Sequence, residues 1–443
     1  MSIHLSLPKI TLPKMAAASA LFAPVLAMAD GTADWLQPVE NLNAGDSAWM
    51  MISAALVLFM TLPGLALFYG GMARKKNVLS MMVQSFAVAA LVSVLWMAVG
   101  YSIAFTPNNG FLGGFDRVFL SGMTFMAEDG KLTIYPGLKT IPESVFFFFQ
   151  MTFAIISSAI ITGAFAERMK FSAIMVFIAL WVLIVYAPTA HWVWGSDGWL
   201  AKDGVLDYAG GTVVHINAGI AGLVGCVLVG KRLGYGKEAM APHNLTLTLI
   251  GVGMLWVGWF GFNAGSAGAA DGRAGMAMVT TQVATAGGAL AWMLCEKVFG
   301  HKASALGLAS GALSGLVGIT PAAGFVAPVP ALVIGILTAV VCYFSVTKLK
   351  IMLKYDDSMD AFGIHGIGGM VGAVLTGVFV STTISGASVN WLAQIEGIVI
   401  TVLYSGIVSL VLLKIIDKTM GLRVDADEER QGLDISSHGE RIE

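Results

Sequence analysis

Two histidines, each preceded by an aspartate eight residues earlier, are the side chains of this sequence best suited to chemistry. The pairs are Asp207 with His215 and Asp357 with His365, and they lie in or beside long apolar segments. Ionisable side chains at hydrocarbon depth are costly, and they usually mark the path of a substrate or a proton. The equal spacing in the two halves of the chain predicts an inverted repeat with a shared site near the midplane.

The chemistry open to such a histidine pair is proton transfer. Two imidazoles in an apolar lumen resist double protonation, because burial and like charge both disfavour the charged form. Together they can accept, donate and relay a single proton. The plainer interpretation of one buried histidine is a hydrogen bond between helices.

The two aspartates also have structural interpretations. Each stands near the start of its helix, where a carboxylate accepts hydrogen bonds from free backbone N–H groups and suits the helix dipole. For Asp207 this capping role is favoured, and attraction of an incoming cation is the alternative. Asp357 has Asp356 and Asp360 as neighbours, so a solvated turn is a further interpretation.

The elements that must hold these residues follow from the composition. The chain has 443 residues, of which 57% are hydrophobic and only 12% are charged. A soluble domain carries about 25% charge, so this composition predicts an all-α polytopic membrane protein. A net charge of −2 gives no basic surface for nucleic acid, and the three cysteines fit no disulfide or zinc spacing. Neither a metal nor another cofactor is expected.

Charge-free runs long enough to cross a bilayer, about 20 residues each, recur along the chain. They predict eleven helices, at approximately 48–69, 79–105, 142–166, 171–191, 210–230, 245–265, 275–295, 303–319, 328–347, 361–383 and 392–413. The connections on one side of these helices, together with the C-terminal tail, hold 18 of the 25 Lys and Arg residues, and the other side holds five. Because positive charge stays in the cytoplasm, the C-terminus is expected there and the mature N-terminus outside.

The first 29 residues are expected to form a signal peptide. Lys9 and Lys14 precede the apolar stretch Met15–Leu26, and Ala27 and Ala29 supply the small residues of a cleavage site. A first transmembrane helix is the alternative. The chain is thereby divided into a signal peptide at 1–29, an eleven-helix domain at 30–418 and a cytoplasmic tail at 419–443.

Long segments of the sequence resemble the Amt/Mep/Rh ammonium transporters, specifically the bacterial Amt proteins. The segments that carry the resemblance are ALVLFMTLPGLALFYGGMARKKNVLSMM, FAERMKFSAI, AHWVWG, DYAGGTVVHINAGIAGLVG, GKRLGYGKEAMAPHN, WVGWFGFNAGSAG, DAFGIHGIGGMVG and GLRVDADEERQGLDISSHGE. The resemblance implies a non-enzymatic homotrimer in the bacterial inner membrane, with two inverted five-helix repeats plus a final helix in each subunit. It also implies an ordered tail and a PII-type (GlnK-class) regulatory protein that binds the cytoplasmic face.

The resemblance further implies roles for individual residues. Those that match the outer recruitment site for ammonium are Phe153, Trp194 and Ser266, supported by Asp207. Phe149 and Phe262 match the aromatic pore gate, and His215 and His365 match the pore histidines. Without the resemblance, the phenylalanines read as core or lipid-facing residues, Trp194 as an interfacial tryptophan, and the polar tail as a solvated, disordered end.

A chemical argument supports transport through such a site. Aromatic faces attract a desolvated cation by about 0.5–2 kcal/mol, whereas burying a bare cation costs on the order of tens of kcal/mol. We therefore expect ammonium to lose its proton before ammonia crosses the apolar pore, with the proton passing separately through the histidines. Potassium has no proton to lose and would be rejected.

Three other functions compete with transport. An ammonium sensor is expected to carry an additional cytoplasmic domain, which the tail is too short to contain. A neutral ammonia channel of the Rhesus type commonly lacks the recruiting tryptophan. A membrane enzyme with His215 and His365 as metal ligands would need a third ligand at suitable spacing.

Overall fold

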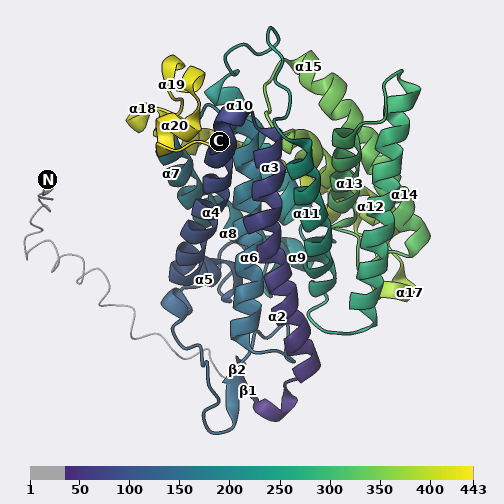
Figure 1. Ribbon diagram of the computed structural model, residues 1–443. Coiled ribbons are helices and arrows are strands. Elements are labelled where there is room, and N and C mark those ends of the chain that lie inside the picture. The colour runs from purple at the N-terminus through teal and green to yellow at the C-terminus, as the bar shows by residue number, and fades with distance from the viewer. Residues whose placement is uncertain (1–34, 443) are drawn as a thin grey trace, which may run out of the picture.

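The computed structural model describes residues 35–442, and most of them belong to one bundle of helices (Figure 1). The predicted signal peptide, residues 1–29, lies outside the described residues. Two short antiparallel strands, β1 (Leu36–Pro38) and β2 (Lys131–Thr133), lie at one end of the bundle, which we call the strand end. The C-terminal helices α19 (Ala426–Gln431) and α20 (Leu433–His438) lie at the other, which we call the tail end.

The helices in this bundle fit the membrane-protein class. Within residues 35–442, ten helical spans are long and apolar enough to cross a bilayer, and the shorter apolar helix α13 (Ala305–Ile319) adds an eleventh. The interrupted spans contain α2 (Ala44–Phe59) with α3 (Ala66–Met72), α4 (Val78–Leu95) with α5 (Tyr101–Phe105), α7 (Phe171–Trp181) with α8 (Ala187–Trp194) and α9 (Trp199–Asp203), and α14 (Pro328–Phe344) with α15 (Lys350–Leu353). The remaining helices are α6 (Glu143–Thr162), α10 (Asn217–Val229), α11 (Leu245–Gly265), α12 (Gly272–Val298), α16 (Ile367–Phe379), α18 (Trp391–Met420) and the short α17 (Thr382–Ser385). The predicted all-α polytopic fold is confirmed.

The predicted helix boundaries are closest where charged or capping residues flank an apolar run. Helix α11 occupies the predicted range, and Asn244 caps it by accepting the N–H groups of Thr246 and Leu247. Helix α18 instead runs seven residues past the predicted end at 413 and reaches Met420. The prediction ended it at the first charged residues. Backbone hydrogen bonds continue through such residues once a helix has left the hydrocarbon.

Six π-helical segments, which the sequence did not predict, interrupt the spans. They are Met60–Leu65, Trp96–Gly100, Val182–Tyr186, Gly211–Ile216, Ser345–Leu349 and Phe362–Gly366. Those of the fourth and fifth spans recur in the ninth and tenth, whereas those of the first and second spans do not recur in the sixth and seventh. Such single turns often accompany functional sites, and each of the two repeated histidines lies in one of them.

The polar C-terminal segment is ordered and packs on the tail end. Asp434 accepts the backbone N–H groups of Leu79 and Ser80 at 3.1 and 2.7 Å, in the first turn of α4. Glu429 accepts the N–H of Leu233 at 2.7 Å and forms an ion pair with Arg423. The tail is therefore joined to the start of α4 and to the connection that follows α10, and the alternative of a disordered end is not observed.

Candidate functional site

The two repeated histidines meet inside the bundle. The Nδ1 atoms of His215 and His365 lie 3.2 Å apart, and both side chains are buried. At this distance one ring nitrogen donates a proton and the other accepts it, so the pair shares a single proton across the contact. The Nε2 atom of His215 is also buried, with no partner among the described residues. The sequence predicted that His215 and His365 lie at a similar depth, and the structure brings them into direct contact.

Glycines make this contact between helices possible. A Cβ atom on Gly219, four residues after His215, would lie 2.3 Å from the backbone nitrogen of Gly366. A Cβ atom on Gly369, four residues after His365, would lie 2.8 Å from the carbonyl oxygen of Gly211. The reciprocal close approach is the arrangement expected where small residues let membrane helices cross.

The two aspartates hold the helix ends that carry the histidines. The Asp207 carboxylate accepts four backbone N–H groups at 2.7–3.1 Å, from residues 210 to 213. The Asp357 carboxylate accepts those of Ala361 and Phe362 at 3.0 and 2.7 Å. Asp357 is only 1% exposed, so the solvated-turn interpretation was wrong. Its neighbour Asp356 accepts three hydrogen bonds from Arg232, which removes it from solvent as well.

The pH dependence of stability should reveal the buried state of Asp357. Burial, together with the nearby Asp360 carboxylate, raises the pKa of Asp357 to about 6, above the value of about 3.9 in an unfolded chain. The folded protein therefore binds this proton more readily, and its stability should rise as the pH falls through 6, by at most about 1.4 kcal/mol per pH unit. Thermal unfolding between about pH 7.5 and 5 should show this contribution in the wild type and not in Asp357→Asn; parallel profiles would contradict it.

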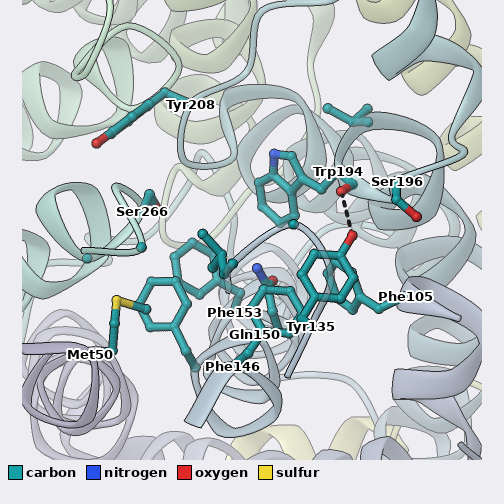
Figure 2. A pocket seen from close by; sticks show the side chains of 16 residues that line it. Met50, Phe105, Tyr135, Phe146, Gln150, Phe153, Trp194, Ser196, Tyr208 and Ser266 are labelled. Atoms are coloured by element: carbon teal, nitrogen blue, oxygen red, sulfur yellow. Dashed lines mark hydrogen bonds between the residues drawn. The ribbon is translucent and has the colours of Figure 1, made fainter. Parts of the chain in front are cut away.

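A recess of about 360 Å³ lies at the strand end of the histidine-bearing helices (Figure 2). Among the residues that line it are Phe149, Phe153, Trp194 and Ser266, which were predicted, and Tyr135, Gln150 and Tyr208, which were not. Figure 2 shows Phe153 and Trp194 facing the same space, where their rings meet edge to face at 5.9 Å between centroids. The recess therefore presents aromatic faces and a few polar atoms, the composition that suits a small cation.

The ring contacts put Phe149 and Phe153 in each other's expected positions. The sequence assigned Phe149 to the gate with Phe262 and placed Phe153 outside it. The structure stacks Phe153 on Phe262, with centroids 4.1 Å apart and planes at 23°, and packs Phe149 on Phe153 at 4.8 Å. Helix α6 starts at the strand end with Glu143, so residue 149 lies about 6 Å nearer that end than residue 153.

The hydrogen bonds of the recess orient its polar groups. The Ser266 hydroxyl donates to the Phe262 carbonyl at 2.8 Å, which leaves its oxygen lone pairs available as acceptors. The Trp194 indole N–H donates to the Asp207 carbonyl at 2.9 Å, which fixes the ring where it lines the recess. Asp207 does not line the recess. Its backbone carbonyl anchors Trp194, and its carboxylate caps the start of the following helix.

A second, much smaller cavity of about 10 Å³ lies beyond the stacked phenylalanines. Its lining comprises Met60, Leu65, Phe68, Ile156, Ile160, His215, Leu255, Trp259, Phe262, Leu313 and His365. This volume holds about one water-sized molecule. Phe153 lines the recess and Phe262 lines this cavity, so their stacked rings form the partition between them.

Trp259 lines the small cavity, and the sequence analysis did not select it. Its indole stacks on His215 at 5.5 Å with planes at 20°, and its N–H donates to Thr320 at 2.9 Å. Helical spacing was a usable signal, because Trp259, Phe262 and Ser266 lie three and four residues apart and share one face of α11. Tyr135 left no such signal, since a loop distant in sequence brings it to the recess.

Comparison with known proteins identifies the family. The family model described as "Ammonium Transporter Family" matches residues 48–442. The chain belongs to the ammonium transporter family. It is 46% identical to an ammonium transporter of Bacillus subtilis over 409 residues, covering 90% of this chain and 98% of that protein. It is 47% identical to an ammonium transporter of Aquifex aeolicus over 410 residues, covering 90% and 94%.

Solved structures agree with this family assignment. The crystal structure of Saccharomyces cerevisiae Mep2 superimposes with a TM-score of 0.79 at 35% identity, covering 87% of this chain and 89% of that one. A structure titled "Sensor Amt Protein" gives a TM-score of 0.82 at 28% identity, covering 89% and 98%. The family and the two curated relatives are ammonium transporters rather than enzymes, and the expectation of a non-enzymatic membrane protein is confirmed.

Proposed function

We propose that this transporter recruits ammonium in the aromatic recess, removes its proton, and conducts ammonia past the His215–His365 pair. The observation that carries this proposal is the partition: a stacked Phe153–Phe262 pair separates a recess with polar acceptors from a one-molecule cavity that holds both imidazoles. In this assignment Phe149, Trp194 and Ser266 hold the cation, while Phe153 and Phe262 form the gate. Asp207 positions Trp194.

Each part of the path has a distinct task. The Ser266 oxygen accepts an N–H of the cation and Trp194 offers its ring face, which together replace part of the hydration shell. The small cavity beyond the gate is too apolar to receive the charged ion. Ammonia passes through it, and the shared Nδ1–Nδ1 contact relays the proton, so net transport carries charge.

We also propose the membrane placement and partners that the family resemblance implies. Residues 1–29 are removed as a signal peptide, and the protein forms a homotrimer in the bacterial inner membrane. The strand end faces outward and the tail end lies in the cytoplasm, in keeping with the 18-to-five bias of Lys and Arg. A PII-type (GlnK-class) protein binds the tail end, where the ordered tail and its ion pairs provide a defined surface.

Currents from proteoliposomes test the proposed transport. An ammonium jump should give a saturable current, and an equal potassium jump should give none. Rapid internal alkalinisation without current would replace the proposal with passive ammonia conduction. Ammonium binding without either signal would favour the sensor function.

The role of the recess can be tested with Trp194→Leu. Loss of one aromatic face should raise the half-saturating ammonium concentration about 2- to 30-fold, because cation–π attraction contributes about 0.5–2 kcal/mol. The maximal current should change less. Trp391→Leu is a matched control, since Trp391 is 45% exposed and lies outside the recess. Equal half-saturation in both variants and the wild type would remove Trp194 from the recruitment site.

A further inference from the structure

An apolar groove of about 660 Å³ runs along the tail-end part of the ninth span. Val341, Phe344, Ile351, Met352 and Ile367 contribute to its lining, and Ile351 and Met352 are 66% and 69% exposed. The groove is continuous with the side of a membrane-spanning helix, because Val341 and Phe344 are themselves exposed on α14. Its single charged lining residue is Lys348.

Lys348 also lines a neighbouring polar pocket of about 430 Å³. The acidic groups of that pocket already have partners: Glu296 accepts the N–H and hydroxyl of Ser304, and Asp360 pairs with Lys350. Lys348 takes part in none of the ion pairs found among residues 35–442. The cation at the junction of the two spaces therefore has no charged partner within the described part of the chain.

Further basic residues lie in the segment beside the polar pocket. The rings of Phe299 and Tyr343 stack at 5.9 Å with planes at 17°, which brings the end of α12 against the end of α14. The residues beside Phe299 include Lys297, His301 and Lys302, and His301 lines the polar pocket. Aromatic rings with lysines beside them are typical of the headgroup level of a bilayer.

We propose that this pair of spaces binds one anionic phospholipid. The phosphate lies at Lys348, the polar headgroup enters the pocket beside His301, and an acyl chain occupies the groove along Val341 and Met352. Charge selects the lipid, because Lys348 has no acidic partner among residues 35–442 while the nearby carboxylates are engaged. The site is separate from the pore, so its occupancy does not depend on the proposed transport mechanism.

The test uses the purified full-length chain in detergent, titrated with dioleoyl phosphatidylglycerol or dioleoyl phosphatidylcholine. Phosphatidylglycerol should raise the thermal unfolding midpoint of the wild type, and phosphatidylcholine should not. The half-effective phosphatidylglycerol concentration should rise about fivefold in Lys348→Gln, the effect of one basic residue near an anionic lipid. Lys348→Glu should abolish the rise in midpoint. Lys237→Glu is the matched control: it makes an equal charge change at an exposed tail-end loop residue outside both spaces. This variant should keep the rise in midpoint caused by phosphatidylglycerol.

Four results would overturn the proposal. The first two are an unchanged phosphatidylglycerol effect in Lys348→Glu and an equal effect of phosphatidylcholine on the wild type. The third is the same protection by soluble glycerol phosphate. The fourth is a change in the oligomeric mass of the Lys348 variants, measured by size-exclusion chromatography with light scattering. The third would show a site for small anions, and the fourth a contact between copies of the chain. Val341→Trp fills the groove without changing charge, and it should weaken phosphatidylglycerol protection at least as much as Lys348→Gln.

Discussion

Replacing both histidines of the buried contact, with His215→Ala and His365→Ala together, should reduce the ammonium current of proteoliposomes about 100-fold. A positioned proton-transfer group contributes factors of this size and above. The two rings share one proton through a 3.2 Å contact, so no other side chain of the small cavity can replace them in the relay. Ammonia would still cross the enlarged apolar cavity, and internal alkalinisation should therefore persist while the current is lost.

A control for the histidine pair is His243→Ala, a half-buried histidine in the connection that follows α10. It should leave the ammonium current unchanged. Single replacements of His215 or His365 should each lose most of the current, because the relay needs both rings. An ammonium-selective current of normal size in the double variant would refute proton relay through this pair.

The second large effect is expected at Asp207. In Asp207→Ala, four buried backbone N–H groups at the start of the helix that carries His215 lose their acceptor. An unsatisfied buried donor costs about 1–3 kcal/mol, and some of the four will find water from the recess. We expect a loss of about 4 kcal/mol in the free energy of unfolding, together with misplacement of Trp194 and His215.

A graded series separates capping by Asp207 from an electrostatic role. Asp357→Ala leaves two backbone N–H groups without their acceptor instead of four, and it should lower the thermal midpoint about half as much. Asp207→Asn keeps one acceptor oxygen in place and should retain part of the stability. If Asp207→Ala unfolds at the wild-type temperature but binds ammonium weakly, the main role of Asp207 is attraction of the cation, the alternative interpretation.

Physical chemistry along the chain determined most of the fold. Hydropathy and charge fix the spans, because a bilayer tolerates neither unpaired backbone groups nor isolated charges. The equal spacing of Asp207–His215 and Asp357–His365 likewise placed both histidines at one depth. Capping of the fifth span by Asp207 was also predictable, since a carboxylate before a helix start satisfies free N–H groups.

Only the tertiary structure decided which side chains touch. The exchange of Phe149 and Phe153 depends on where Phe262, from a helix a hundred residues away, meets α6. Burial of Asp356 depends on Arg232, which engages it from another connection. The π-helical turns, the part of Tyr135 in the recess and the apolar groove at Lys348 likewise depend on packing between distant segments. Local sequence encodes the preference of a segment for membrane or water, whereas a site made by several helices exists only where their side chains meet.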